Sequence, residues 1–350
     1  MRSSDSSGPS PAAREASVYR ARSRFTASGA NMRPLAQLPD SVDGICTVAR
    51  AQTIHHNLLG YYRITPAKRD SLVRVRPPRL EELLAALRRI PPGDLDPERP
   101  PTARLLGACV QESYFLAGLL RSRGFATRVR AGYFREIMNN PGVTLPFWRS
   151  ALAARGMDEA ERLRDPDTWK HEVDELTSRQ IRCDHHIEHW LCEVWDAQSA
   201  RWELLDANTD FLRAHSGIEV PFRLPARFFE FAWEAWLRMR LEPGYQPDQH
   251  AEEPQDGRSH IRSQMLSDFY SLLNHDAAGT AEPSDSLRAF VKGRTFAELS
   301  STELRDLDSL AWTLSGPASV DQLRRLYEHS PTLRDPVIEQ DPHVLVRPRP

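Results

Sequence analysis

Cys109 carries the first chemistry that the sequence suggests. It follows Gly107 and opens the segment ACVQESYFLAGLL, whose apolar residues recur at helical spacing. A thiol in the first turn of a helix lies at the positive end of the helix dipole, which favours the thiolate. Backbone N–H groups at the same point can hold an oxyanion. These features are typical of a nucleophile for acyl transfer, although a buried, inert cysteine would fit the same helix.

A base for this nucleophile lies in a hairpin further along the chain. The segments IEHWLCEVWD and RWELLDAN are typical of strands, and the four residues AQSA connect them. If Asp196 lies opposite Arg201, then His189 and Asp206 share a face as diagonal neighbours, roughly 7–8 Å apart. A register one residue different would place them on opposite faces. The sequence therefore permits the two side chains to meet.

Cys109, His189 and Asp206 could then act together. In such an arrangement His189 takes the proton of the thiol, and Asp206 fixes the tautomer of the imidazole and stabilises its charged form. The sequence permits this Cys–His–Asp arrangement without requiring it.

Four blocks of the sequence resemble the transglutaminase-like superfamily, whose core is papain-like. That family has a glycine and a catalytic cysteine at a helix start, a GxPARxxxGY-like strand, an HxWxEVY-like strand and a W-x-x-L/V-D ending. The blocks here are GAC (107–109), GFATRVRAGY (124–133), HWLCEVW (189–195) and WELLD (202–206), and they cover about a third of the chain. The resemblance implies Cys109 as nucleophile, His189 as base and Asp206 as orienting acid.

The chain departs from the family pattern at several points. Trp190 is adjacent to His189, whereas the family has a tryptophan two places after its histidine. Phe-Ala replaces the proline of the family's IPAR sequence, and LDA replaces LDP. None of these differences removes a catalytic atom. The insertion at 135–184 lengthens the gap between the cysteine and histidine blocks, and it could reshape or cover the cleft.

Three tryptophans are candidates for substrate binding. Trp148 and Trp169 belong to the insertion and could line a pocket, because loops on a rigid scaffold commonly set specificity. Trp190 is the third candidate through its place beside His189, although packing within the hairpin would also account for it.

A metal site is an alternative use of the residues around His189. Cys183, His185, His186 and Cys192 are all possible zinc ligands. Their spacing matches no finger or ribbon, and adjacent histidines on a strand would point in opposite directions. The sequence also lacks an EF-hand loop for calcium. We therefore expect no metal and no cofactor.

The composition excludes several functional classes. The chain has 350 residues, 40% of them hydrophobic, and a net charge of −2. It has no basic tract that would follow a nucleic acid, and its apolar runs are too short to span a bilayer. Four cysteines without an export signal are typical of free thiols in a reducing compartment. We therefore expect a cytoplasmic protein with neither a nucleic acid nor a membrane as partner.

The order of elements predicts an α+β fold. The resemblance implies a papain-like transglutaminase core, in which the cysteine helix packs on an antiparallel sheet, with helical N- and C-terminal additions and a helical insertion. The expected organisation is a disordered tail (1–31), a catalytic domain (32–242) with a helical N-terminal part (33–100) and the insertion (135–184), a linker (243–259), a helical region (260–335) and a Pro-rich tail (336–350).

Two functional hypotheses follow. The first is an acyltransferase, amidase or cysteine protease that passes a peptide, amide or thioester acyl group to an amine or to water through Cys109. The second is a binding or scaffolding protein that keeps the fold without turnover. Selective alkylation of Cys109 near neutral pH would separate the two.

Overall fold

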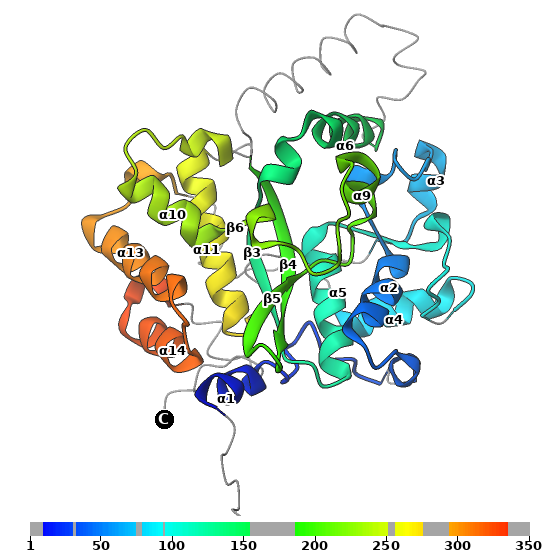
Figure 1. The fold of residues 1–350 in the computed structure, drawn as a ribbon, viewed down its shortest axis with the longest axis horizontal. Coiled ribbons are helices and arrows are strands. Elements are labelled where there is room, and N and C mark those ends of the chain that lie inside the picture. Colours follow the sequence, from blue (N-terminus) through cyan, green and yellow to red (C-terminus); the bar gives the residue numbers. More distant parts are fainter. Residues whose placement is uncertain are drawn as a thin grey trace, which may run out of the picture.

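A four-stranded antiparallel sheet lies at the centre of the computed structural model, with helices on both sides (Figure 1). The strand order is β5-β4-β3-β6. The structure describes residues 10–30, 33–74, 79–93, 95–154, 186–250, 256–275 and 294–334. The strands of the central sheet are β3 (Thr127–Phe134), β4 (Ile187–Asp196), β5 (Arg201–Leu205) and β6 (Phe229–Phe231). Mixed helices and an antiparallel sheet agree with the expected α+β class.

The helices form two groups around this sheet. In Figure 1, α2, α4 and α5 lie on one side, and α10, α11, α13 and α14 lie on the other. None of the helices in the described part of the chain is long and apolar enough to cross a membrane. Their bounds are α1 (Pro11–Val18), α2 (Val42–Gln52), α3 (Pro66–Ser71), α4 (Leu80–Arg89), α5 (Cys109–Ser122), α6 (Pro141–Ala154), α9 (Asp210–Ser216), α10 (Ala232–Leu241), α11 (Gly257–Leu272), α13 (Ser301–Ser315) and α14 (Val320–His329).

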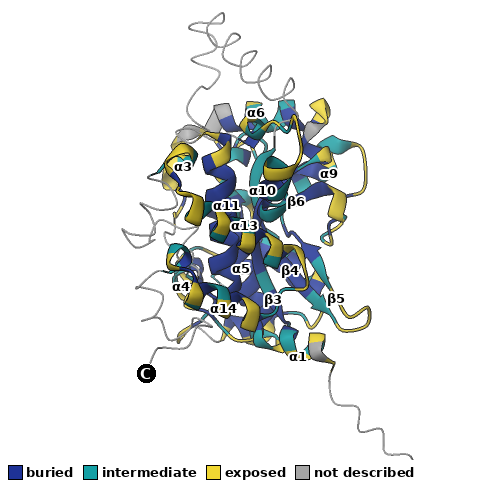
Figure 2. Ribbon diagram, turned by 90° about the vertical axis from the view of Figure 1, so that its left-hand side faces the viewer, coloured by how far each residue is buried: buried dark blue, intermediate teal, exposed yellow. Residues whose placement is uncertain are grey.

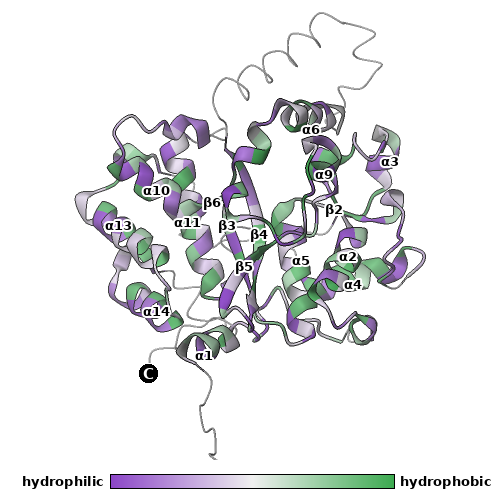
Figure 3. Cartoon of the chain, in the orientation of Figure 1, coloured by the Kyte–Doolittle hydropathy of each residue, from purple (hydrophilic) through white to green (hydrophobic). Residues whose placement is uncertain are grey.

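Helix α5 is the central helix of the first group and is buried along most of its length (Figure 2). Helix α4 packs against it through an apolar stripe, and its opposite side is hydrophilic (Figure 3). The two helices approach so closely that a Cβ atom at Gly118 would lie 2.9 Å from Leu80. Gly124, at φ +83°, follows the end of α5 in the left-handed conformation expected of a residue after a helix. The packing against α4 therefore fixes the position of α5 at its middle.

Of the registers that the sequence left open, the β4–β5 hairpin has the one in which His189 and Asp206 share a face. Asp196 pairs with Arg201 across the four-residue connection, and Cys192 pairs with Leu205. Among the described residues, β5 pairs with β4 only from Cys192 onward. The preceding residues of β4, including Trp190, therefore have β3 alone as a strand partner. The start of α5 approaches the sheet beside these residues of β4, which have no partner in β5.

Helix α11 covers the edge of β3 that β6 leaves open. Asp268 accepts a hydrogen bond from the Ala131 N–H at 3.0 Å, and the Ser271 hydroxyl donates to the Val129 carbonyl at 3.0 Å. Asp268 also binds Arg130 through both carboxylate oxygens, at 2.8 and 2.9 Å. Side chains of α11 thus take the place of a further strand along this edge of β3. An unpaired strand edge would otherwise be open to pairing with other chains. The C-terminal helical region is part of the sheet's support.

The expected disordered tail is wrong for residues 10–30. Tyr19 is fully buried, and its hydroxyl donates to the Leu272 carbonyl at 3.1 Å. Its ring meets Trp202 edge to face at a centroid distance of 5.6 Å. Phe25 is also fully buried. The average composition of the segment is polar, but its few large apolar side chains dock between distant elements, which composition does not reveal.

Two other expectations about the organisation need correction. The N-terminal part is not purely helical, because β1 (Thr53–His55) and β2 (Leu105–Gly107) form a parallel pair. The expected linker at 243–259 includes His250, whose side chain is fully buried. The turn η6 (Pro247–His250) is therefore packed into the fold at His250. Residues 336–350 lie outside the described residues.

Replacing Tyr19 by alanine is expected to lower the free energy of unfolding by roughly 3–5 kcal/mol, the usual cost of removing a large buried aromatic ring. Urea denaturation followed by circular dichroism measures the change. Trp312→Ala is the control, because Trp312 is 59% exposed; a change within about 0.5 kcal/mol is expected there. Equal effects of the two substitutions would mean that Tyr19 is not docked in solution.

Candidate active site

Cys109 is the first residue of α5, directly after strand β2. The backbone N–H of Ala108 donates to the Gln111 side chain at 2.8 Å, which secures the start of the helix. Strand β1 runs beside β2, and His55 pairs with Gly107 in their parallel register. Both the helix packing and the β1–β2 pair therefore hold the thiol in place.

His189 is fixed by two neighbours. Its Nε2 atom lies 2.8 Å from Asp206 Oδ2, within a hydrogen bond. The ring of Phe134 stacks on the imidazole, with a centroid distance of 3.8 Å and an interplanar angle of 18°. Asp206 is itself held, because its Oδ1 accepts the Asn208 N–H at 2.7 Å. Since Asp206 engages Nε2, Nδ1 is the ring nitrogen that can receive a proton.

The structure brings the three expected catalytic residues together around one small cavity. Its volume is about 10 Å³, close to the space that a single water molecule needs. The cavity is lined by Cys109, Glu112, Ser113, Leu116, His189, Trp190, Leu205, Asp206, Ala207 and Asn208. The site therefore combines a thiol, an imidazole and a carboxylate in a nearly closed space.

Burial raises the pKa of the Cys109 thiol well above its usual range, and the negative charge of Glu188 adds to the rise. Backbone N–H groups of Trp190 and Val110 act in the opposite direction, because they interact favourably with the thiolate. Although some surface of Cys109 remains accessible, desolvation of the sulfur is the largest effect. The closed site thus holds a neutral thiol, and not the thiolate that the helix dipole alone would favour.

Glu112 is a member of the site that the sequence did not reveal. Burial and the nearby charge of Asp206 raise its pKa to about 8, although contacts with Asn208 and Thr53 lower it. Its carboxyl group is therefore mostly protonated at neutral pH and can donate a hydrogen bond. Its position in the first turn of α5 did not indicate a role in the site, because acidic residues are common in the first turn of helices, where they stabilise the helix.

No protein-family model matches the chain, and no curated protein or solved structure matches it. A proposal for the function of the chain therefore depends on the geometry and electrostatics of the site.

The tryptophans expected to bind substrate have different positions. Trp190 lines the cavity, but its ring is 2% exposed and packs near Tyr114, and its Nε1 donates to Glu188. Trp148 belongs to α6, which packs on the turn η2 (His56–Leu58) and on α9, and it does not line the cavity. Trp169 lies outside the described residues.

The zinc ligands considered from the sequence do not form a cluster in the described part of the chain. Cys192 is buried, and its thiol donates to the Ser113 carbonyl at 3.2 Å. His186 lies instead against Glu230, with Nδ1 3.0 Å from Oε2. Cys183 and His185 lie outside the described residues.

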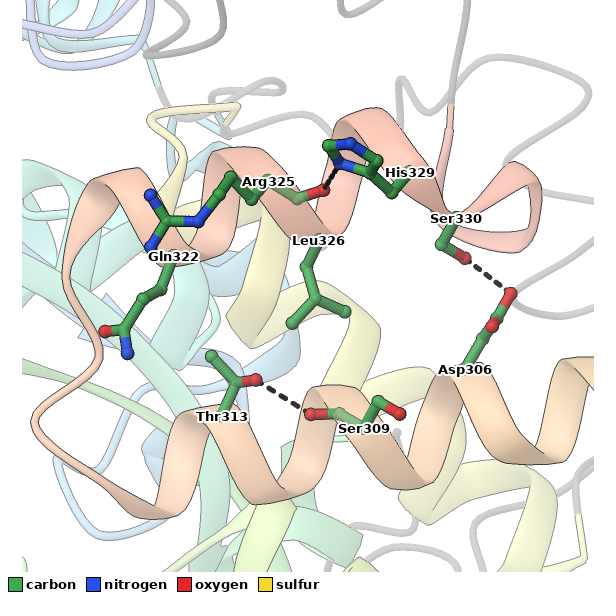
Figure 4. Close-up of a pocket in the computed structure, with 8 residues that line it drawn as sticks. All are labelled: Asp306, Ser309, Thr313, Gln322, Arg325, Leu326, His329 and Ser330. Atoms are coloured by element: carbon green, nitrogen blue, oxygen red, sulfur yellow. Dashed lines mark hydrogen bonds between the residues drawn. The ribbon is translucent and has the colours of Figure 1, made fainter.

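A larger hollow of about 430 Å³ lies between α13 and α14 (Figure 4). Several of its polar groups are already engaged: Ser330 donates to Asp306 at 2.6 Å, and the Thr313 hydroxyl donates to the Ser309 carbonyl at 2.8 Å. His329 donates through Nδ1 to the Arg325 carbonyl at 2.7 Å. This hollow pairs no nucleophile with a base, so the cavity at Cys109 is the better candidate for catalysis.

Glu112→Gln is expected to flatten the dependence of stability on pH. The pKa of Glu112 rises from 4.5 to about 8 on folding. Its favourable contribution is therefore complete below pH 4.5 and is lost as the pH rises toward 8, by on the order of a few kcal/mol. Glutamine keeps the shape but cannot ionise.

Urea denaturation of both proteins between pH 5 and pH 9 checks this expectation. Glu219→Gln serves as the control, because the Glu219 side chain is 81% exposed. Parallel pH curves for wild type and Glu112→Gln would contradict the buried, protonated carboxyl group.

Proposed function

We propose that this chain is a cysteine-dependent acyl-transfer enzyme with a papain-like, transglutaminase-like core. The observation that carries the proposal is the 2.8 Å bond between His189 Nε2 and Asp206 Oδ2, in a cavity that Cys109 also lines. A thiol at a helix start, a histidine on a strand and a carboxylate that orients it form a complete set for nucleophilic catalysis. The arrangement of a cysteine helix against an antiparallel sheet also supports this family.

The reaction begins with a neutral thiol. His189 Nδ1 accepts the proton as the Cys109 sulfur attacks the carbonyl carbon of the donor, forming a C–S bond and a tetrahedral oxyanion. Backbone N–H groups near the sulfur, including that of Val110, can donate to this oxyanion. The C–N or C–S bond of the donor then breaks, and His189 returns the proton to the leaving amine or thiol. Asp206 stabilises the imidazolium throughout.

The second half of the reaction releases the acyl group. An amine or water loses a proton to His189 and attacks the thioester, and Cys109 leaves and is reprotonated. The donor is a peptide, an amide or a thioester, because each has a carbonyl open to a thiolate. Function in a reducing compartment such as the cytoplasm fits the need for a free thiol, and Cys46, Cys109 and Cys192 are all free.

Intact-mass trapping tests the proposal. Purified protein is mixed with a panel of small amides, esters and thioesters and quenched in acid. The expected result is a mass increase equal to one acyl group, mapped to Cys109 by peptide analysis and removed by hydroxylamine. Absence of any adduct across thioesters, which are the most reactive donors, would contradict the proposal.

A non-catalytic binding protein is the second candidate. The small cavity and the raised pKa of the Cys109 thiol favour it, since both lower the reactivity of the free protein. This candidate predicts that Cys109 resists both iodoacetamide and thioesters in folded protein, yet reacts after denaturation. The enzyme predicts reaction with thioesters in the folded state.

A further inference from the structure

A second group of polar side chains lies buried at the end of the sheet, away from the Cys109 cavity. His186 directly precedes β4, Glu230 belongs to β6, and His250 ends the turn η6 (Pro247–His250). The backbone N–H of His186 donates to the Gln249 carbonyl at 3.0 Å, which brings the first and third of these segments together. Three segments that are distant in the sequence thus present one side chain each to the same point.

The donor atoms of these side chains are close together. Glu230 Oε2 lies 3.0 Å from His186 Nδ1 and 3.1 Å from His250 Nε2. All three donor atoms lie within 4.8 Å of one another. The Glu230 and His250 side chains are fully buried, and that of His186 is 11% exposed. Two imidazoles and a carboxylate are therefore gathered where water scarcely reaches.

The angles at His186 differ from those of a simple hydrogen bond. Its Nδ1 is buried and has no hydrogen bond within the described part of the chain, despite lying 3.0 Å from the carboxylate. Ligand atoms about 2.0–2.1 Å from a tetrahedral ion are ~3.3 Å apart, and their lone pairs converge on the ion instead of on each other. The approach of His186 Nδ1 to Glu230 Oε2 matches this arrangement, whereas His250 Nε2 is hydrogen-bonded to the same oxygen at 3.1 Å.

The surrounding groups orient the carboxylate and leave one of its oxygens for an ion. Arg238 binds Glu230 Oε1 at 2.8 Å, so Oε2 is the oxygen that faces the two histidines. The Tyr245 hydroxyl lies 3.2 Å from His250 Nε2, beside the same point. Tyr133 packs edge-on against the His250 ring at a centroid distance of 4.5 Å. The contact of Arg238 with Glu230 is of the kind that orients a carboxylate ligand in protein metal sites.

We propose that His186, Glu230 and His250 bind a divalent transition-metal ion, with Zn²⁺ as the best match. Two imidazole nitrogens and one carboxylate oxygen are a common ligand set for zinc, and three protein ligands leave a further position for water or the Tyr245 hydroxyl. The ion would join the start of β4 to β6 and to the segment before α11. It would thereby stabilise the end of the sheet three residues from His189, without taking part in the thiol chemistry.

Metal binding by the full-length protein tests this site directly. Wild-type protein is stripped with a chelator and titrated with Co²⁺, whose visible absorption reports the coordination geometry, and then with Zn²⁺ as competitor. The expected result is one Co²⁺ per chain with tetrahedral or five-coordinate bands, displaced by one equivalent of Zn²⁺. A rise in melting temperature with Zn²⁺ is also expected, because the ion binds the folded state. Absence of any Co²⁺ or Zn²⁺ binding to folded wild-type protein would overturn the proposal.

Substitutions then assign the ligands. His186→Gln, at the least buried ligand, and Glu230→Gln are expected to weaken Zn²⁺ binding at least tenfold. His260→Gln is the matched control, because His260 is another buried histidine beside a carboxylate, 3.1 Å from Glu188, and should keep wild-type affinity. Unchanged binding in His186→Gln and Glu230→Gln, with loss in Cys183→Ser, would place the metal elsewhere and overturn the assignment. Metal content is the readout in every case, so the outcome is independent of acyl transfer.

Discussion

Cys109→Ala protein is expected to form no acyl adduct with any donor that acylates the wild type, a loss of at least a thousandfold in rate. The sulfur is the atom that bonds to the substrate, and no other described cysteine lines the cavity. Alanine is smaller than cysteine and apolar, so the start of α5 should stay intact. Intact-mass spectrometry measures the adduct, and thermal denaturation checks the fold.

Cys46→Ala provides the matched control for this substitution. Cys46 is a free cysteine with no exposed surface, and it packs in the same apolar core as α5. Its replacement should lower stability but leave acylation of Cys109 in place. An adduct that persists in Cys109→Ala and disappears in Cys46→Ala would show that Cys46, and not Cys109, is the nucleophile.

Asp206→Asn is expected to slow acylation by roughly 10³–10⁴-fold at neutral pH, the loss known when a triad carboxylate becomes an amide. The amide has no charge to stabilise the imidazolium that forms as His189 takes the proton. The deficit should persist as the pH rises. Burial raises the pKa of the Cys109 thiol well above its usual range, so the thiol stays neutral at neutral and mildly alkaline pH and continues to need His189 as its base.

The measurement is the rate of thioester acylation from pH 6 to pH 10. Asp210→Asn is the control, because Asp210 lies four residues further along and pairs with Arg50 at 2.6 Å. It should keep the wild-type profile. Identical profiles for Asp206→Asn and wild type would remove Asp206 from the catalytic group, whatever its distance from His189.

The local elements near the site could be predicted from sequence. The helix from Cys109, the strand at 127–134 and the hairpin register all depend on neighbours within a few residues. A two-residue period with one apolar face leaves few ways to pair the strands, and a four-residue connection then places His189 beside Asp206. Short-range patterns therefore permitted His189 and Asp206 to meet, and the resemblance of four sequence blocks to the transglutaminase-like superfamily added Cys109 to the group.

Contacts between distant segments could not be predicted in this way. The pairing of β1 with β2, the docking of Tyr19 and the burial of Glu112 each depend on residues brought together only in the folded chain. The grouping of His186 with Glu230 and His250 is of the same kind, because its members lie 44 and 20 residues apart. The composition of a segment gives only its average polarity, whereas these contacts depend on single side chains.

The packing of α11 on the edge of β3 affects how the chain can fold while it is being synthesised. Asp268 and Ser271 lie more than 130 residues after the strand whose edge they complete. A ribosome that has released β3, β4 and β5 has therefore not yet released the groups of α11 that bind the backbone of Ala131 and Val129. The sheet is expected to stay incomplete and prone to pair with other nascent chains until α11 emerges. The shortest fragment that folds alone should thus extend through α11, well beyond Asp206.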